Sequence, residues 1–431
     1  MTDDTPVKLY DARFAADPRA VYEELRARHG GYAPAELAPG VPATVVLGYD
    51  AALDVLKDPL TFRKDPRGWQ KTAAPGCPML PALGYRASAL FSDGPVHSRL
   101  RKTITDSFDR VDVFALRDRV ERSADELIDR FCADGEADLS AQYGARLPLM
   151  VFTQLFGCPP EIGDRFLRSM ILMGDLSDAE QAASMFTGAS RDLIALKRSQ
   201  PGADITSWLI AHPAGLTDEE LTEQIGLLIG KGASPVCYLI GNALRLLLSD
   251  ARFADDLSNG SLPVEDALDE VLWTDPPIPN MGVTYTDHEV EREGHLIPPD
   301  QPVVISFAAA NTDPAKQTDH RVGNRSHLAF GAGPHTCPAR NHARVMASSA
   351  IEKLLDRLPD LHLSVPPASL TWHPGPFHRA LTSLPVSFTP APTLPKPATP
   401  PASPPLHVPE PSTPPAPSLA RRLLQAVRRL L

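Results

Sequence analysis

The fold of this protein is decided by one segment, which reads HLAFGAGPHTCPARNHARVMASSAIEKLL over residues 327–355. Gly331 and Gly333 permit tight turns with positive φ, and Pro334 stiffens the loop that leads to Cys337. Apolar residues after the cysteine recur at helical spacing, so its sulfur is expected close to a helix N-terminus. The positive end of a helix dipole and nearby loop amides both stabilise a thiolate. The segment therefore predicts a cysteine suited to bind a metal as an anion.

Two plainer interpretations of the same cysteine remain open at this point. Cys337 could be a buried free thiol, because cysteine behaves as a small apolar residue and is commonly buried. Alternatively, His335, Cys337 and His342 could bind zinc, although no second cysteine pair is nearby.

The loop FGAGPHTCPA (330–339) resembles the cysteine-ligand loop of cytochromes P-450, F-G-x-G-x-H/R-x-C-x-G/A. It matches that pattern at Phe330, Gly331, Gly333, His335, Cys337 and Ala339. The resemblance implies haem b (iron protoporphyrin IX) with Cys337 as the axial iron ligand and Phe330 packed near the sulfur. It also implies that His335 lies near a haem propionate, and His327 is interpreted as a second propionate-binding position.

A second segment, DGPVHSRLRKTITDSF (93–108), resembles the helix of that family that begins D-x-P-x-H-x-x-x-R. His97 and Arg101 stand four residues apart and therefore lie one above the other on a helix face. Two such donors suit a carboxylate, and the resemblance assigns them to a haem propionate. The alternative is a solvated basic helix face.

Helical periodicity dominates the chain before residue 389 and predicts a mainly α domain with small β-sheets. The resemblance covers about residues 10–388 and implies the cytochrome P-450 fold. Helical patterns occur at 20–29, 121–133, 221–230 and 241–257, and β-like runs at 43–49, 295–309 and 381–388. The resemblance places haem between a central helix at about 220–249 and the helix after Cys337. The segment 60–92 is expected to cover the pocket.

The proline distribution divides the chain into a domain (1–388), a linker (389–417) and a terminal helix (418–431). The linker holds 13 of the 46 prolines and is expected to be extended and disordered. The terminal segment has an apolar face and a basic face. The apolar face comprises Leu419, Leu423, Val427 and Leu430, and the basic face Arg421, Arg422, Arg428 and Arg429. Such a helix could dock on a protein partner or an anionic membrane surface, or simply aid solubility.

Composition excludes several classes of protein. A net charge of −11 argues against a nucleic-acid partner. The five cysteines are scattered, odd in number and form no CxxC pair, as is typical of a reduced cytosolic protein. The sequence shows neither a signal peptide nor an apolar stretch long enough to span a membrane. We therefore expect a cytoplasmic protein.

The sequence departs from the family in the helix that usually carries E-x-x-R. Here ALDEVLWTDPPIP (267–279) has Glu270 but places Trp273 at the arginine position, as in an actinobacterial subgroup with E-x-x-W, which the chain resembles. A buried carboxylate without a partner is costly. Glu270 must therefore find another donor, stay protonated or point outward, while Trp273 is expected to pack and to donate its indole N–H.

The central helix also departs from the family, which has A-G-x-[D/E]-T there for proton delivery. In LLIGKGASPVCYLIGN (227–242) the acid position holds Ser234 and the threonine position holds Pro235. Neither residue can replace the acid and alcohol, and a mid-helix proline costs about 3 kcal/mol. Gly232, Ala233 and Val236 are expected to line the distal pocket. A downstream stretch, 279–290, lacks the usual propionate-binding arginine.

The function that these features favour is that of a monooxygenase. By the resemblance, one oxygen atom from O2 would be inserted into a small apolar organic substrate, with electrons from ferredoxin and ferredoxin reductase. The ferredoxin would dock on a surface that includes Arg340 and Arg344. The alternatives are a haem-thiolate enzyme that uses peroxide or rearranges its substrate, and a non-catalytic haem protein acting as a partner or regulatory subunit.

Overall fold

The computed structural model describes residues 6–174, 179–253, 264–316 and 323–395. The chain divides into two units, residues 1–393 and 394–431. The expected terminal helix at 418–431 and most of the proline-rich linker lie outside the described residues, so the domain boundaries at 388 and 417 stay predictions.

The first unit is mainly helical, as expected, and its helices account for most of its core. The α-helices are α1 (Ala12–Ala16), α2 (Pro18–His29), α3 (Tyr49–Lys57), α4 (Arg67–Thr72), α5 (Leu80–Leu83), α6 (Gly94–Phe108), α7 (Val113–Ile128), α8 (Leu147–Leu155), α9 (Pro160–Gly174), α10 (Ala179–Ser199), α11 (Ile205–Ile210), α12 (Asp218–Ser249), α14 (Val264–Thr274), α15 (Phe307–Asn311) and α16 (Arg340–Arg357). Short helical turns are η1 (Ala89–Phe91), η2 (Ser140–Gly144), η4 (Pro314–Lys316), η5 (Gly333–His335) and η6 (Pro367–Ser369).

Three small sheets complete the unit. Their strands are β1 (Val7–Lys8), β2 (Tyr32–Ala38), β3 (Val41–Val46), β4 (Glu136–Asp138), β5 (Asn280–Thr284), β6 (Val290–Arg292), β7 (His295–Ile297), β8 (Val303–Ser306), β9 (His362–Leu363) and β10 (Pro385–Ser387). The largest sheet has the order β1-β2-β3-β8-β5, and the others are β4-β10-β9 and β6-β7. Strand β8 pairs in parallel with β3 and antiparallel with β5, which joins chain segments far apart in the sequence.

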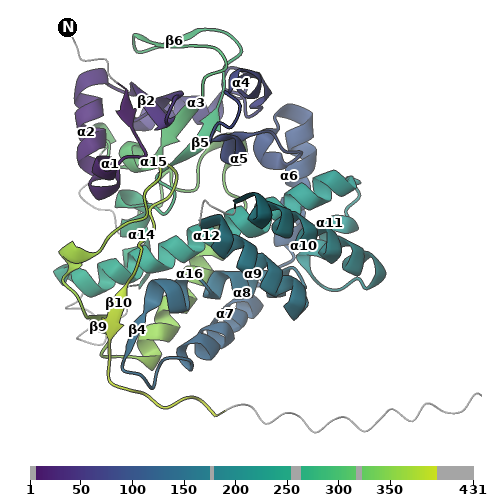
Figure 1. Cartoon of the computed structure of the whole chain (residues 1–431), viewed down its shortest axis with the longest axis vertical. Helices are drawn as coiled ribbons and strands as arrows, with labels where there is room; N and C mark the ends of the chain where they lie inside the picture. The colour runs from purple at the N-terminus through teal and green to yellow at the C-terminus, as the bar shows by residue number, and fades with distance from the viewer. Residues whose placement is uncertain (1–5, 175–178, 254–263, 317–322, 396–431) are drawn as a thin grey trace, which may run out of the picture. The chain divides into compact units, whose positions relative to one another are not determined.

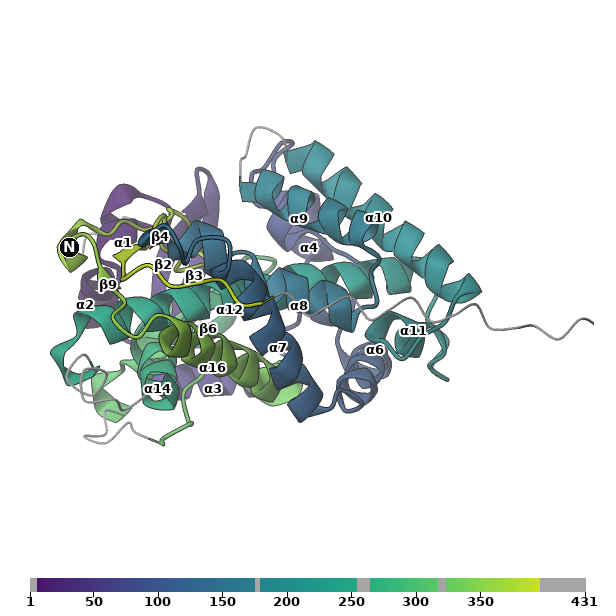
Figure 2. The same cartoon turned by 90° about the horizontal axis from the view of Figure 1, so that it is seen from below.

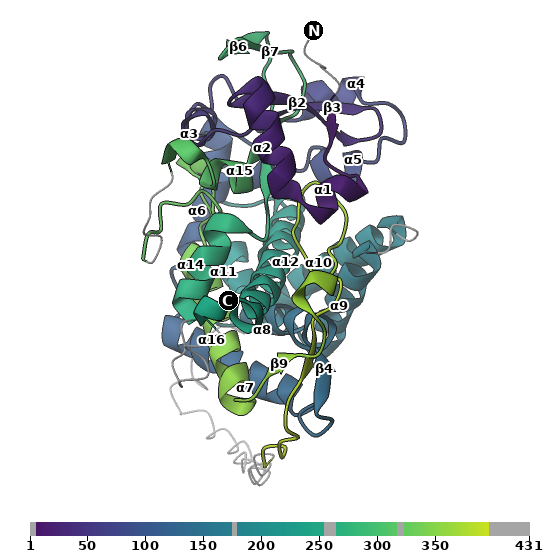
Figure 3. The same cartoon turned by 90° about the vertical axis from the view of Figure 1, so that its left-hand side faces the viewer.

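Helix α12 crosses the middle of the unit, between the five-stranded sheet with α1 to α3 and the helices α7 to α10 (Figures 1 and 3). A capping box begins it: Glu220 N–H donates to the Thr217 hydroxyl, and Thr217 N–H donates to the Glu220 carboxylate. Contrary to the expectation from the sequence, this helix is by length and composition apolar enough to cross a membrane, but 56% of its most apolar window is buried inside the protein. The central helix expected at 220–249 therefore serves as the core helix of the fold.

Helix α16 lies beside α7 and also contacts α12, so the helix after Cys337 packs directly on the central helix (Figure 2). The helical pattern expected at 241–257 breaks at Ser249, where Asp250 adopts an extended conformation. The pattern expected at 121–133 ends as a helix at Ile128 and continues as turns. Helix–helix contacts thus hold the cysteine segment in place.

Candidate functional site

The cysteine loop has the turns that its glycines predict. Gly331 and Gly333 have φ values of 70° and 68°. A side chain on Gly333 would overlap the backbone carbonyl of Leu56 at the end of α3, so the loop packs tightly against that helix. Cys337 N–H donates to Phe330 O at 2.8 Å, and Ala339 is the N-cap residue of α16. The sulfur therefore lies beside a helix N-terminus.

Opposing influences act on the Cys337 thiol. Burial is the largest of them and raises its pKa above the usual value. A hydrogen bond from Ala339 N–H and the positive charges of Arg101 and Arg340 act in the opposite direction. The protein alone therefore leaves the thiol protonated, and a further positive charge at the sulfur is needed to hold the thiolate.

His97 and Arg101 of α6 meet the cysteine loop. The imidazole rings of His97 and His335 lie 4.0 Å apart, and the Arg101 guanidinium donates to Thr336 O. Burial, followed by the charges of His335 and Arg101, lowers the pKa of His97 to about 4, so its ring is neutral at pH 7. The Nε2 atom of His97 is buried and has no hydrogen-bond partner, whereas His335 Nε2 lies 3.5 Å from the Asp93 carboxylate. Three donors expected to hold a carboxylate are thus brought together.

Lys64 adds a cation to this group that sequence reasoning missed. Its side chain is buried, and Nζ donates to the carbonyls of Gly282 at 2.8 Å and Val283 at 3.0 Å. Burial lowers its pKa to about 8, while the charge of Asp93 opposes that shift. The stretch 279–290 lacks the family's propionate-binding arginine, which indicated that another cation could take its place. That this cation is Lys64, bound to the carbonyls of β5, follows only from the tertiary structure.

His327 packs between Trp273 of α14 and Phe330 of the cysteine loop. It is buried with its ring edge-on to Trp273, at 5.9 Å between centroids, and 5.8 Å from Phe330. Burial, aided by the charges of Arg344 and Arg325, lowers its pKa to about 4. Its Nδ1 is buried and has no hydrogen-bond partner, and its assignment to a second propionate stays a prediction.

Trp273, at the position where the family usually has arginine, packs as expected. Trp273 is buried, and its indole N–H donates to Asn324 O at 2.6 Å. Glu270 has found another donor, because Arg252 lies 3.6 Å from its carboxylate. Trp273 therefore contributes one hydrogen bond and a large apolar surface beneath the loop.

A different buried ion pair lies between α14 and α16. The Arg344 guanidinium donates to the carboxylates of Asp269 and Glu265, and both Arg344 and Asp269 are buried. The prediction that Arg344 belongs to an exposed docking surface was therefore wrong, because its charge is paired inside the protein. Arg340, in contrast, is exposed.

Comparison with known proteins agrees with this geometry. No protein-family model matches the chain. The chain is 34% identical to the cytochrome P450 monooxygenase PikC of Streptomyces venezuelae over 87% of its length and 92% of the relative. The chain belongs to the cytochrome P450 family. It is also 32% identical to 6-deoxyerythronolide B hydroxylase of Saccharopolyspora erythraea, over 86% of the chain and 96% of the relative.

The structure of testerone-bound CYP154C4 from Streptomyces sp. ATCC 11861 superposes with a TM-score of 0.81 at 27% identity, covering 90% of this chain and 99% of that one. The P450 fold inferred from the sequence is confirmed, and the chain is a P450 monooxygenase. P450 relatives bind haem, so the residues around Cys337 can be tested for their fit to that cofactor.

The fit to haem is good on the cysteine side of the molecule. A half-buried thiol at a helix N-terminus, the unpartnered Nε2 atom of His97, the His335 ring and the guanidinium of Arg101 all gather there. The thiol suits the axial ligand of an iron atom, and the histidines and Arg101 suit the two propionate carboxylates of haem. For zinc, the described ranges contain no group of three or more histidine, cysteine or acidic side chains placed to hold a metal.

The central helix packs closely at the positions expected to line the distal pocket. Ala233 and Val236 are buried, Gly232 is half-buried, and a side chain on Gly232 would meet the Phe152 ring at 2.7 Å. The assignment of these residues to the pocket stays a prediction. Ser234 and Pro235 are half-exposed instead, and the Ser234 hydroxyl donates to Gly230 O at 3.1 Å.

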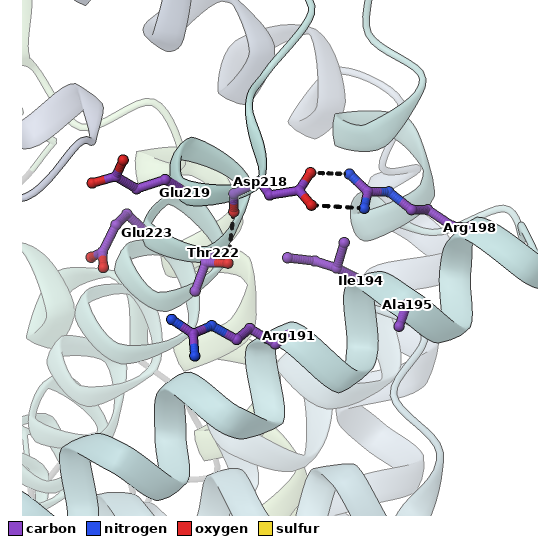
Figure 4. Close-up of a pocket in the computed structure, with 8 residues that line it drawn as sticks. All are labelled: Arg191, Ile194, Ala195, Arg198, Asp218, Glu219, Thr222 and Glu223. Atoms are coloured by element: carbon purple, nitrogen blue, oxygen red, sulfur yellow. Dashed lines mark hydrogen bonds and ion pairs between the residues drawn. The ribbon is translucent and has the colours of Figure 1, made fainter.

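A separate pocket lies between α10 and the start of α12 (Figure 4). An ion pair between Arg198 and Asp218 crosses one side of it, and Glu219 and Glu223 are on the other. None of the residues that line it belongs to the cysteine loop or to α6. This P450 therefore has a charged surface pocket that plays no part in the site around Cys337.

Proposed function

We propose that the chain binds haem b through the thiolate of Cys337, with His97, Arg101 and His335 holding the haem propionates. The observation that carries this proposal is the meeting of α6 and the cysteine loop, where the buried His97 Nε2 has no hydrogen-bond partner and lies beside His335 and the Arg101 guanidinium. Buried polar groups rarely remain unpaired in native proteins. Two carboxylates at this place would satisfy all three side chains.

Lys64 is proposed to supply the cation that strand β5 lacks. Its ammonium group donates hydrogen bonds to two carbonyls of β5, and its charge lowers the pKa values of both His97 and His335. It is therefore within electrostatic reach of both imidazoles. A buried ammonium is costly without a counter-charge beyond Asp93. A propionate would provide that charge.

The proposed reaction is insertion of one oxygen atom from O2 into a small organic substrate, with electrons from a ferredoxin and its reductase. Bound haem supplies the oxidation chemistry. The protein contributes the buried sulfur ligand, the carboxylate-binding side chains and a site closed by the segment 60–92. Arg340 is exposed three residues after the ligand and is proposed as part of the docking surface for an acidic ferredoxin.

A second candidate is oxidation driven by peroxide. It is favoured by the residues that replace the usual acid and alcohol. The Ser234 hydroxyl is engaged with Gly230 O, and Pro235 has no N–H or hydroxyl to donate. Peroxide is already reduced by two electrons and carries its protons, so its use requires less of this part of the helix.

Two measurements test the proposal. The reduced, CO-bound protein is expected to absorb near 450 nm, and Cys337→Ala to lose that band. Product formed per NADPH with ferredoxin and reductase is then compared with product formed from peroxide. A wild-type protein that never carries haem, or that keeps the same spectrum after Cys337→Ala, contradicts the proposal.

Two further proposals concern place and partner. We propose a cytoplasmic enzyme, in keeping with five cysteines that the sequence leaves unpaired. We also propose that the basic segment 418–431 docks on an anionic membrane or a protein partner. Deletion of 389–431 is expected to reduce co-sedimentation with anionic vesicles or recovery of the partner. Unchanged values for both would remove this role.

A further inference from the structure

The pocket between α10 and the first turns of α12 has a volume of about 400 Å³, which is room for a small organic molecule (Figure 4). The Arg198 guanidinium of α10 donates to both oxygens of the Asp218 carboxylate of α12 and so joins the two helices along one side of the pocket. Ile194 of α10 also lines the pocket, and its side chain is buried. The hollow is thus bounded by an ion pair and by an apolar residue of the core.

The wall of the pocket that α12 forms is held in place from the opposite side. The Arg99 guanidinium of α6 donates to the Glu220 carboxylate in the first turn of α12. One turn later Gln224 is fully buried, where it accepts from Ala89 N–H and donates to Leu100 O, both at 3.1 Å. The side chains that line the pocket leave these same two turns, so they start from a fixed backbone. Such pre-organisation favours binding of a ligand.

Two carboxylates of this wall have no cation. Glu219 and Glu223 line the pocket four residues apart, where like charges on a helix repel one another. Among the described residues, neither of them forms an ion pair or a hydrogen bond. Thr222 stands beside them with 9% of its surface exposed, and its hydroxyl donates to Asp218 O at 2.7 Å, which leaves the hydroxyl oxygen free to accept. Two carboxylates and an acceptor oxygen suit an ammonium group.

The wall that α10 forms carries an unpaired charge of the opposite sign. Arg191 lines the pocket, and Figure 4 shows its side chain on the side of Thr222, away from the pair of Arg198 and Asp218. Within the described ranges the Arg191 guanidinium forms no ion pair. A guanidinium binds a carboxylate through two parallel hydrogen bonds. The pocket therefore has an unpaired cation on one wall and unpaired anions on the other.

We propose that this pocket binds a small zwitterion, whose ammonium group lies between Glu219 and Glu223 and whose carboxylate lies on Arg191. The three carboxylates that line the pocket outnumber its two guanidiniums, so a ligand with only a negative charge is repelled. A simple amine would leave Arg191 without a partner, whereas a molecule with both charges pairs all three side chains. The inference goes beyond the proposed function, because this ligand is a second molecule bound away from the site around Cys337.

The test uses 5-aminopentanoate, pentylamine and pentanoate as probes, because they share a five-carbon chain and differ only in their charged ends. Ligand-observed NMR titration of the purified full-length protein measures the three affinities and does not depend on haem chemistry. Wild type is expected to bind 5-aminopentanoate at least about tenfold more tightly than either of the other probes, the gain typical of one added hydrogen bond to a charged group.

Substitutions on the two walls should give opposite patterns. Arg191→Gln is expected to abolish the preference for 5-aminopentanoate over pentylamine and to keep the preference over pentanoate. The double variant Glu219→Gln/Glu223→Gln should keep the first preference and abolish the second. A variant that had merely lost its fold would lose both preferences together, so the crossed pattern identifies a site with two charged ends.

Arg168→Gln is the matched control, since Arg168 is exposed on α9, lies outside the pocket and should leave all three affinities unchanged. Equal affinities of wild type for the three probes, or the absence of saturable binding, would overturn the zwitterion site. So would unchanged preferences in Arg191→Gln and in the double variant. A protein without a haem spectrum would contradict the proposed function alone, and the probe affinities would still decide the pocket.

Discussion

The Arg344 guanidinium of α16 is buried against the Asp269 carboxylate of α14. This ion pair ties the helix that follows Cys337 to the helix in which Trp273 stands at the family's arginine position. Glu265 and Arg325 extend the pair toward the surface. The position that usually holds a buried arginine is therefore apolar here, and a second, nearby arginine carries the charge between these helices.

Asp269→Asn is expected to lower the free energy of unfolding by about 3–5 kcal/mol, because it leaves the Arg344 charge buried without its partner. Urea unfolding of the full chain measures this. Glu265→Gln is the control: Glu265 binds the same guanidinium but is half-exposed, so its loss should cost below about 1 kcal/mol. Equal effects of the two substitutions would show that burial of the pair is unimportant.

Gly333→Ala is expected to abolish haem retention or folding, while Gly331→Ala is tolerated. Both glycines have φ near 70°, which costs an L-residue roughly 1–2 kcal/mol. Only at Gly333 would the added methyl also overlap the Leu56 carbonyl, whereas at Gly331 the nearest atom is 3.8 Å away. Haem content per protein measures the difference. Similar losses in both variants would mean that backbone strain alone matters.

Lys64 predicts a pH dependence of haem retention. Burial lowers its pKa to about 8, and a bound propionate favours the charged form. The advantage of wild type over Lys64→Met should therefore be full below pH 8 and decline above it, by at most tenfold per pH unit. The neighbouring His97 and His335 have lowered pKa values and stay neutral in this range.

The rate of haem transfer to an acceptor protein measures that retention between pH 7 and 10. Lys64→Arg is the control, because arginine stays charged throughout and should remove the pH dependence. A wild-type rate that does not change relative to Lys64→Met across this range would rule out a role for the Lys64 charge in holding the cofactor.

Trp273→Phe is expected to lower the free energy of unfolding by about 1 kcal/mol, because it removes the hydrogen bond to Asn324 O and keeps most of the apolar contact with His327. Trp273→Arg should be more destabilising, because the new charge would be buried while Glu270 is already paired with Arg252. A stabilising effect of Trp273→Arg would mean that the tryptophan merely substitutes for a lost ion pair. Thermal unfolding compares the two variants.

The sequence by itself determined the family, the mainly helical fold, the cysteine loop and the bounds of the central helix within two residues. These features depend on local patterns: positive-φ glycines, helical periodicity and a loop motif, all read from neighbouring residues. The meeting of His97 and Arg101 with His335 also followed, because the resemblance placed both segments at one cofactor.

Only the tertiary structure decided which charges are paired. Arg344 was expected outside and lies buried on Asp269, and Lys64 reaches the β5 carbonyls. The physical reason is common to both. The free energy of a charge depends on its burial and on partners far away in sequence, and neither is encoded in the residues beside it.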